Sequence, residues 1–333
     1  MTVKLLYLTD QYLDFLSDDI LYGLRYLLGA DVVDHPKKNI LYASGKGKVD
    51  DSLIWAGGST AFGLNDIEID REDIDKKIRM KYFDWVINSN CWRIKYIGHE
   101  NTVVLDGEDH GILHPMYIGR ATAYYKRELL WKNSRTRPIQ FSLPDHLLDL
   151  ELLPKTQNIN ASFSVYPGQR EELSKRFKVD LFSNWQEYRN NIKRSWFGIS
   201  PKGAGYDCQR HYEILGLSVL CVYLDNNAPI ILRKSFIDGE NCITFNNIGE
   251  LNEKIDKCKD PSSLIENGKE ALLKYHLSSC RAKKILDDLT IMNPKKRYFP
   301  TCADLQHGFI PYSKRILHRF IRNNHLKSIP KIV

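Results

Sequence analysis

The stretch WFGISPKGAGYDCQRHYEILGLSVLCVYL, residues 196–224, contains the pattern from which the fold can be predicted. A short apolar run at 196–199 is followed by a loop with two glycines, a helical segment at 209–215 and a very apolar run at 219–224. A strand, a tight turn, a helix and a second strand in this order predict a βαβ unit. Such a unit has a right-handed crossover and builds a parallel sheet.

The same alternation continues outward in both directions. Before this stretch we expect strands at 3–8, 30–33, 52–55, 83–87, 102–105, 121–125 and 161–166. We expect helices beginning at Asp18 and Asp19 and ending before Gly29, and at 71–80, 168–177 and 185–194. After it we expect short strands at 230–232 and 242–245, and helices at 248–258 and 263–286.

A change in composition divides this pattern into two halves. Pro144, Pro154 and a polar stretch at 155–160 place a boundary near residue 156. The chain is therefore predicted to be α/β, with two Rossmann-like domains facing a cleft. Residues 1–155 would form the first domain and 156–310 the second, followed by a basic segment at 311–333.

Length and composition agree with a globular protein of this kind. The 333 residues are 43% hydrophobic and 27% charged, which is typical of two ordinary folded domains. No apolar run approaches the roughly 18 residues that a membrane-spanning helix needs. The seven cysteines are scattered and include no CxxC pair, which argues against a zinc site or a disulfide framework. We therefore expect a cytoplasmic protein.

The formal net charge of +7 is concentrated partly near the carboxyl end. Residues 314–331 contain six Lys or Arg side chains and no acid, with apolar residues at helical spacing between them. One interpretation is a helix at the inner face of a membrane, peripheral to it and close to lipid-linked acceptors. The other, which we favour, is a terminal helix that packs on the first domain with its basic side chains in solvent.

The loop at 200–208 joins a buried strand to a helix, where main-chain N–H groups can point at an anion. Gly203 and Gly205 would allow positive φ angles and a close approach of a phosphate. Arg210 adds a cation, and Glu213 lies on the same helix face, where a carboxylate could accept both hydroxyls of a ribose. The alternative is a structural turn with a solvated Arg–Glu pair.

The residues of this loop also carry a family resemblance. The pattern S-P-x-G-x-G-x-D-x-x-R-x-x-E is matched at Ser200, Pro201, Gly203, Gly205, Asp207, Arg210 and Glu213. It resembles the donor-binding signature of GT-B glycosyltransferases, especially the exostosin-like and spore-maturation-type bacterial groups. The segment 217–221 departs from that pattern, because a small residue followed by proline is usual there.

The resemblance implies two Rossmann-like domains, with the nucleotide-sugar donor on the second and the acceptor mostly against the first. Carried over, Glu213 would hold the ribose, and Arg210 with the glycine loop would serve the diphosphate. Ser200, Lys202 and Asp207 belong to the same predicted donor site. GT-B donors are held by main chain and cations, so no metal or other cofactor is expected.

Polar residues also follow two predicted strands of the first domain. Asp106, Glu108, Asp109 and His110 follow the strand at 102–105, at the end where ligands of parallel sheets gather. Asp109 and His110 are candidates for a general base that deprotonates an acceptor hydroxyl. The alternative is an acidic turn capped by Asp106.

Lys126 and Arg127 follow the tyrosine-rich strand at 121–125 and could complete a phosphate clamp across the cleft. The alternative, slightly favoured, is that both are solvated residues at a strand end.

These observations predict a glycosyltransferase that moves a sugar from a nucleotide-sugar donor to a glycan, a glycoconjugate or another hydroxyl acceptor. The alternative is a non-catalytic nucleotide- or nucleic-acid-binding protein, which the positive charge and basic tail would suit. Under the first hypothesis nucleic acid is not an expected partner. A Rossmann dehydrogenase is disfavoured because residues 9–18 contain no glycine.

Overall fold

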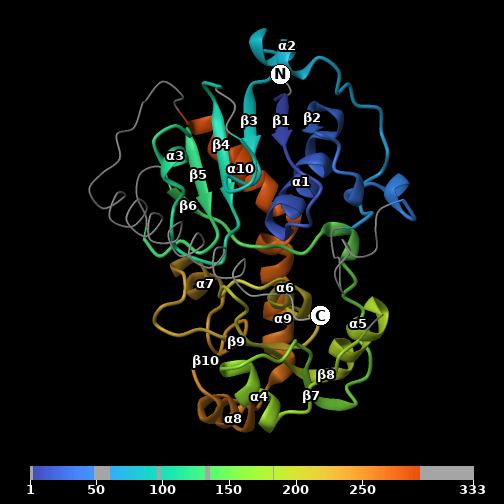
Figure 1. Cartoon of the computed structure of the whole chain (residues 1–333). Helices are drawn as coiled ribbons and strands as arrows, with labels where there is room; N and C mark the ends of the chain where they lie inside the picture. Colours follow the sequence, from blue (N-terminus) through green and yellow to red (C-terminus); the bar gives the residue numbers. More distant parts are fainter. Residues whose placement is uncertain (1–2, 49–60, 96–98, 132–135, 183, 293–333) are drawn as a thin grey trace, which may run out of the picture.

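The computed structural model describes residues 3–48, 61–95, 99–131, 136–182 and 184–292. In this part of the chain the strands form two sheets, one of six strands in the order β2-β1-β3-β4-β5-β6 and one of four in the order β10-β9-β8-β7 (Figure 1). Neighbouring strands are parallel in both sheets. The predicted α/β architecture with two Rossmann-like domains is confirmed.

The elements of the first sheet and its helices are β1 (Leu5–Leu8), α1 (Phe15–Leu28), β2 (Val32–His35), α2 (Ile74–Arg79), β3 (Trp85–Asn88), β4 (Thr102–Asp106), α3 (Pro115–Ile118), β5 (Ala123–Lys126) and β6 (Thr136–Pro138). Helix α1 begins earlier than expected, because the Asp14 side chain accepts a hydrogen bond from the Ser17 amide as its N-cap. It ends at Gly29, whose φ of 57° supports the predicted C-cap. The strand expected at 52–55 lies outside the described residues.

The second sheet and its helices are formed by β7 (Gln157–Ala161), α4 (Gln169–Arg176), α5 (Trp185–Arg194), β8 (Ser195–Ser200), α6 (Gln209–Ile214), β9 (Val219–Tyr223), α7 (Ile230–Ser235), β10 (Ile243–Phe245), α8 (Ile248–Lys257), α9 (Pro261–Ala271) and α10 (Ser278–Ile291). Two of the expected strands were wrong. Strand β7 ends where the strand at 161–166 was expected to begin. The apolar run expected as a strand at 230–232 starts α7, because Pro229 precedes it as the N-cap residue.

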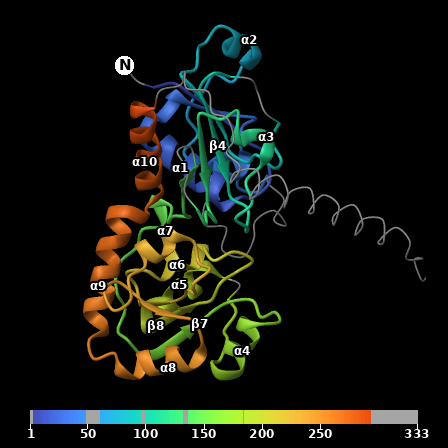
Figure 2. The same cartoon turned by 90° about the vertical axis from the view of Figure 1, so that its left-hand side faces the viewer.

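The helix expected at 263–286 is interrupted at the junction of the two domains. Between α9 and α10 the chain makes a π-helical turn, Leu272–His276, and then an extended residue, Leu277. Helix α9 lies along the second domain and α10 along the first (Figure 2). There α10 packs on α1, where a Cβ atom on Gly23 would lie 2.1 Å from the Ser278 carbonyl oxygen. The last described helix therefore returns to the first domain.

One apolar core cluster extends across both domains. A single cluster of buried side chains includes Ile20 of α1, Ile285 of α10 and Tyr212 of α6. The carboxyl ends of the first-sheet strands point toward the second domain (Figure 1). None of the described helices is long and apolar enough to cross a bilayer. The basic segment at 311–333, with its expected terminal helix, lies outside the described residues.

Candidate functional site

The glycine loop between β8 and α6 is held in shape by one buried imidazole. His211 Nε2 donates a hydrogen bond to the Tyr206 carbonyl at 2.8 Å, and Nδ1 accepts one from the Ser200 hydroxyl at 2.7 Å. Burial lowers the pKa of His211 to about 3. The ring is therefore neutral near pH 7 and ties both ends of the loop together. Ser200, predicted in the donor site, is fully buried in this role.

The two glycines of the loop serve a different purpose from the one expected. Neither Gly203 nor Gly205 has a positive φ angle, so that part of the prediction was wrong. Glycine is needed at position 205 because side chains of the first domain lie very close to the main chain there. A Cβ atom there would lie 2.5 Å from Glu128 Oε1 and 3.0 Å from both Arg127 Nη2 and Asp109 Oδ1. At Gly203 the nearest atom would be the Cys208 sulfur at 3.3 Å, which is a looser environment.

Arg127 connects this loop to the first domain. Its fully buried guanidinium donates from Nε to the Gly107 carbonyl at 3.0 Å, and from Nη1 to the Asp207 carbonyl at 2.5 Å and to Glu128 Oε1 at 2.8 Å. Nη2 donates to Asp109. Glu128 Oε1 also accepts from the Asp207 amide at 3.1 Å. The interpretation of Arg127 as a solvated strand-end residue is therefore wrong, since it lies at the centre of the domain contact.

Lys126 is also buried, in an ion pair within the first domain. Its ammonium group lies 2.7 Å from Asp106 Oδ1 and donates to the Glu108 carbonyl at 3.1 Å. Both side chains of the pair are fully buried, so the solvated interpretation is wrong for Lys126 as well. Asp106 also accepts a hydrogen bond from the Tyr124 hydroxyl.

The carboxylate of Asp207 accepts hydrogen bonds from groups inside the protein. Oδ2 accepts from the Phe141 amide at 2.7 Å, and Oδ1 accepts from the Tyr212 hydroxyl at 2.7 Å. Burial raises the pKa of Asp207 to about 6, against the opposing effect of Arg127. The side chain thus fixes the segment that leads from the first domain into the second.

Arg210 and Glu213 line a cavity of about 170 Å³ beside α5 and α6. Its other lining residues are Ser162, Phe163, Ser164, Asp180, Leu181, Phe182, Asn184, Trp185 and Tyr188. Glu213 Oε2 accepts from the Tyr188 hydroxyl at 2.8 Å, and burial raises the pKa of Glu213. The Arg210 guanidinium lies 5.9 Å from the Phe163 ring, and its Nη1 is buried without a hydrogen-bond partner among the described residues. The structure therefore joins a cation, a carboxylate and several aromatic rings in one cavity.

A second arginine, not predicted from the sequence, supports the loop from α4. Arg170 donates from Nε to the Lys202 carbonyl at 2.9 Å and from Nη1 to the Ser164 carbonyl at 3.1 Å. Burial, reinforced by the nearby charge of Arg210, lowers the pKa of Arg170. Burial raises the pKa of the Cys208 thiol, and the charges of Arg210, Arg170 and Arg127 oppose that rise. The loop is therefore surrounded by three guanidinium groups.

Lys202 lies on the outer side of the loop. Its ammonium group is 4.9 Å from the centre of the Tyr206 ring and 5.6 Å from that of Tyr223. These two rings are stacked, and both hydroxyls donate to Asp225, at 2.7 Å and 3.1 Å. Lys202 therefore forms a cation–aromatic–carboxylate group at the carboxyl ends of β8 and β9.

The two candidates for a general base have different surroundings. Asp109 accepts from Arg127 and faces Gly205, and its side chain is 53% exposed. His110 packs edge-on to Trp92, with ring centres 5.4 Å apart, and its Nε2 lies 3.6 Å from Glu108 Oε2. Its Nδ1 accepts from the Ile112 amide at 3.2 Å. Asp109 is thus an accessible carboxylate directly beside the glycine loop.

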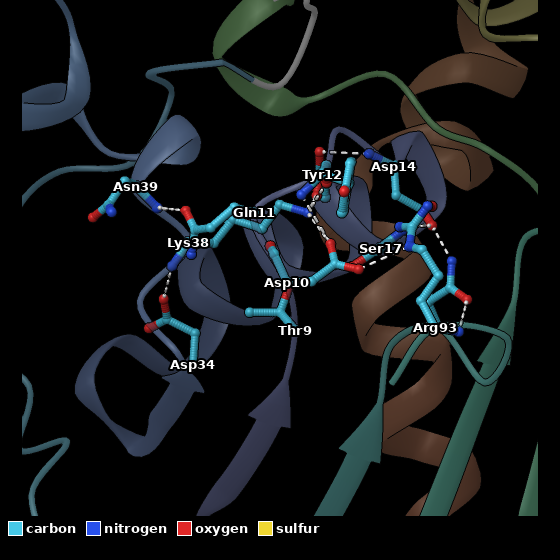
Figure 3. Close-up of polar contacts among 12 residues, drawn as sticks. Thr9, Asp10, Gln11, Tyr12, Asp14, Ser17, Asp34, Lys38, Asn39 and Arg93 are labelled. Carbon is cyan, nitrogen blue, oxygen red and sulfur yellow. Dashed lines mark hydrogen bonds and ion pairs between the residues drawn. The ribbon is translucent and has the colours of Figure 1, made fainter. Parts of the chain in front are cut away.

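A further polar cluster, which the sequence analysis did not identify, lies at the carboxyl ends of β1 and β2 (Figure 3). Asp10 lies between Lys38 and Arg93, and its Oδ2 accepts from Arg93 Nε at 2.8 Å. Arg93 also pairs with Asp14 at 3.1 Å, and its guanidinium lies 5.4 Å from the ring of Tyr12, which is 63% exposed. The sequence contained a signal for this cluster, because Asp10 lies two residues after the end of the first predicted strand, at 3–8. The first domain therefore carries a second group of polar side chains, separate from the one that follows β4 and β5.

Among the residues that the structure describes, no three His, Cys, Asp or Glu side chains are grouped so that they could hold a metal ion.

No model of a known protein family matches the chain, and no curated protein sequence matches it. Solved structures do. A glycosyltransferase from Rickettsia africae ESF-5 superposes with a TM-score of 0.54 over 86% of this chain and 98% of that one, at 10% identity. Anabaena Alr3699/HepE in complex with UDP gives a TM-score of 0.49 over 86% and 100%, at 11% identity. At 10% identity the first of these superpositions establishes the fold alone, and that fold is the GT-B arrangement of two Rossmann-like domains.

Proposed function

We propose that this chain is a glycosyltransferase that uses a nucleotide-sugar donor. The observation that carries the proposal is the cavity that joins Arg210 and Glu213 beside the loop where the two domains meet. In open α/β sheets, ligands bind at the carboxyl ends of the strands, and this cavity lies there. The exostosin-like or spore-maturation-type subgroup, suggested by the loop pattern, is part of the same proposal.

The cavity suits the nucleoside half of a donor. The aromatic side chains of Phe182 and Trp185 provide faces against which a base can stack. Tyr188 uses Glu213 Oε2, so Oε1 can accept the hydroxyls of a ribose. A hydrogen bond to an ionised carboxylate is among the stronger kinds, and binding a ligand hydroxyl would also favour the charged form of this buried group.

The diphosphate is assigned mainly to Arg210. Two amides of the loop have internal partners, since Gly203 N donates to the Cys208 sulfur and Asp207 N to Glu128. Arg210 Nη1, in contrast, is a buried donor without a partner among the described residues. A buried donor of this kind gains the most when an anion arrives, because leaving it unpaired is costly. The positive field of Arg170 acts in the same direction.

The transfer step needs a group that accepts the proton of the acceptor hydroxyl. As the bond from the sugar carbon to the diphosphate oxygen breaks, the acceptor oxygen bonds to that carbon and its proton passes to a base. Asp109 is assigned this role, since it is exposed and adjoins the loop. Arg127 orients one of its oxygens and leaves the other for the acceptor. Arg210 stabilises the charge on the leaving diphosphate.

Three of the predicted donor residues are better assigned to positioning. Asp207, Arg127 and Lys126 are buried in contacts within and between the domains, and those contacts hold the loop against the first domain. On the acceptor side, Tyr12 and Arg93 present an exposed ring and a cation beside Asp10, a combination suited to a hydroxyl-rich molecule such as a glycan.

A thermal-shift screen against nucleoside diphosphates and their sugars tests the proposal. A ligand that binds only the native state raises the unfolding midpoint with its concentration. We expect at least one nucleoside diphosphate to do so, and its sugar conjugate to be consumed when a hydroxyl acceptor is present. The absence of a shift with every nucleotide would contradict the proposal.

A further inference from the structure

A second, larger cavity of about 670 Å³ lies where α7, α9, the π-helical turn and α10 meet the end of the first sheet. We call it the hinge cavity. It is defined by Tyr125, Gln140, Lys234, Lys274, His276 and Arg281. None of its lining residues is shared with the cavity of Arg210 and Glu213. It is therefore a separate space, lined by both domains.

The hinge cavity contains a buried hydrogen-bond donor that has no partner among the described residues. Gln140 is only 1% exposed, and its Oε1 accepts from Ser235 Oγ at 3.1 Å and from Arg281 Nη2 at 2.9 Å. A guanidinium can only donate, so the amide oxygen must be the atom that faces Arg281. The amide nitrogen, Nε2, is then the atom left unpaired among the described residues. Such a group is costly unless a ligand or water accepts its hydrogen bond.

Within the described part of the chain, the acceptors that Arg281 contacts beside this amide are all neutral. Its Nη2 also lies 2.6 Å from His276 Nδ1, and its Nε lies 3.4 Å from the Phe141 carbonyl oxygen. Burial and the Arg281 charge lower the pKa of His276 well below its usual value, so the imidazole is neutral and accepts through Nδ1. No carboxylate of the described chain forms an ion pair with this guanidinium, so its charge remains available to an anion.

The charges on the rim of the cavity nearly balance. Lys234 and Lys274 line it together with Glu240 and Glu270, and Lys284 pairs with Asp288, so among the described residues the charge that remains without an opposite partner is that of Arg281. Lys274 belongs to the π-helical turn, which presents three consecutive residues, 274–276, to the cavity. Single π-helical turns in otherwise α-helical segments often occur at functional sites.

We propose that the hinge cavity binds a small organic anion, with a phosphate or carboxylate group between Arg281 and Gln140 Nε2. The remainder of the ligand would lie against the apolar side chains of Ile139 and Ile285 and the ring of Tyr125. Because residues of both domains line the cavity, its occupant stabilises the arrangement of the domains in which these residues come together. By linkage, it changes the affinity of the donor site. The cavity is thus an effector site, and its existence does not depend on the identity of the donor.

Titration calorimetry with citrate and with glucose 6-phosphate tests this proposal, and the two probes distinguish a carboxylate from a phosphate ligand. Wild-type protein should bind at least one of them. Arg281→Gln should weaken that binding by about tenfold or more, and Lys274→Gln, on the exposed rim, by a smaller factor. Lys283→Gln is the matched control, because Lys283 lies on the same helix but pairs with Asp287 outside the cavity. It should bind like wild type.

Two further arms separate this site from the donor site. Glu213→Ala should keep its affinity for the probe, and a saturating probe should change the affinity of wild-type protein for nucleoside diphosphates by several-fold. The inference is overturned if neither probe binds at millimolar concentration, if Arg281→Gln and Lys274→Gln both bind like Lys283→Gln, or if Glu213→Ala abolishes probe binding. If the probe leaves nucleotide affinity unchanged, its role as an effector is overturned. Probe binding without nucleotide binding would contradict only the proposed function.

Discussion

Arg127 of the first domain donates a 2.5 Å hydrogen bond from Nη1 to the main-chain carbonyl of Asp207, in the glycine loop of the second domain. Glu128, the next residue, accepts from the amide of the same Asp207. One peptide segment of the loop is therefore held on both sides by the first domain. The shape of the loop and the relative placement of the domains are consequently coupled, and substitutions on either side should affect both.

Gly205→Ala should be far more harmful than Gly203→Ala. A methyl group at Gly205 would meet Glu128, Arg127 and Asp109, whereas one at Gly203 would meet the Cys208 sulfur at a longer distance. We expect Gly205→Ala to lower the free energy of unfolding by about 1–3 kcal/mol, as overpacking does, and to reduce turnover strongly. Denaturant unfolding and turnover measured on both variants check this. Equal effects of the two substitutions would show that close approach is not what selects glycine at 205.

His211 should make the protein sensitive to acid. Its pKa is about 3 in the folded state, below the usual 6.5, so the unfolded chain takes up a proton first as the pH falls. The stabilising contribution is complete above pH 6.5 and is lost as the pH falls toward 3. Between these limits the free energy of unfolding should fall by about 1.4 kcal/mol per pH unit through this group.

His211→Gln is the variant that isolates this contribution, because glutamine keeps hydrogen-bonding capacity without titrating. Its free energy of unfolding should decline less steeply than that of the wild type as the pH is lowered through this window. Denaturant titrations at several pH values on both proteins supply the comparison. Parallel pH profiles would assign the acid sensitivity to other groups.

Asp109→Asn should separate binding from chemistry. The change preserves size and removes the proton acceptor, so nucleotide affinity should persist while turnover falls by about 10²–10⁴-fold. His110→Gln is the parallel variant, because His110 contacts Trp92 and Glu108 rather than the loop. It should retain most activity. Full activity in Asp109→Asn with loss in His110→Gln would transfer the role to His110, and full activity in both would place the base elsewhere.

The sequence predicted the architecture because the alternation of strands and helices is a local pattern repeated along the chain. One of its errors has a local cause, and another does not. Short apolar runs such as 230–232 do not distinguish a strand from a helix, and Pro229 decided in favour of α7. The break between α9 and α10 has no such signal within 263–286, because it is imposed by the change from one domain to the other.

The site was predicted only in part, for a related reason. The loop pattern indicated Arg210 and Glu213, which the fold brings together in one cavity. The long-range partners were not predictable, since Arg127 and Asp207 are 80 residues apart and Arg170 reaches the loop from α4. Neither spacing nor composition carries information about which distant side chains will meet across a domain contact.

The most direct test of the central claim is titration calorimetry of nucleoside diphosphates with wild-type protein, Glu213→Ala and Tyr188→Phe. Glu213→Ala removes the proposed ribose ligand, and Tyr188→Phe removes only the hydroxyl that bonds to it. We predict measurable binding to the wild type, a loss of about 1.5–3 kcal/mol in Glu213→Ala, and a smaller loss in Tyr188→Phe. Unchanged affinity of Glu213→Ala for every nucleotide that the wild type binds would contradict the account.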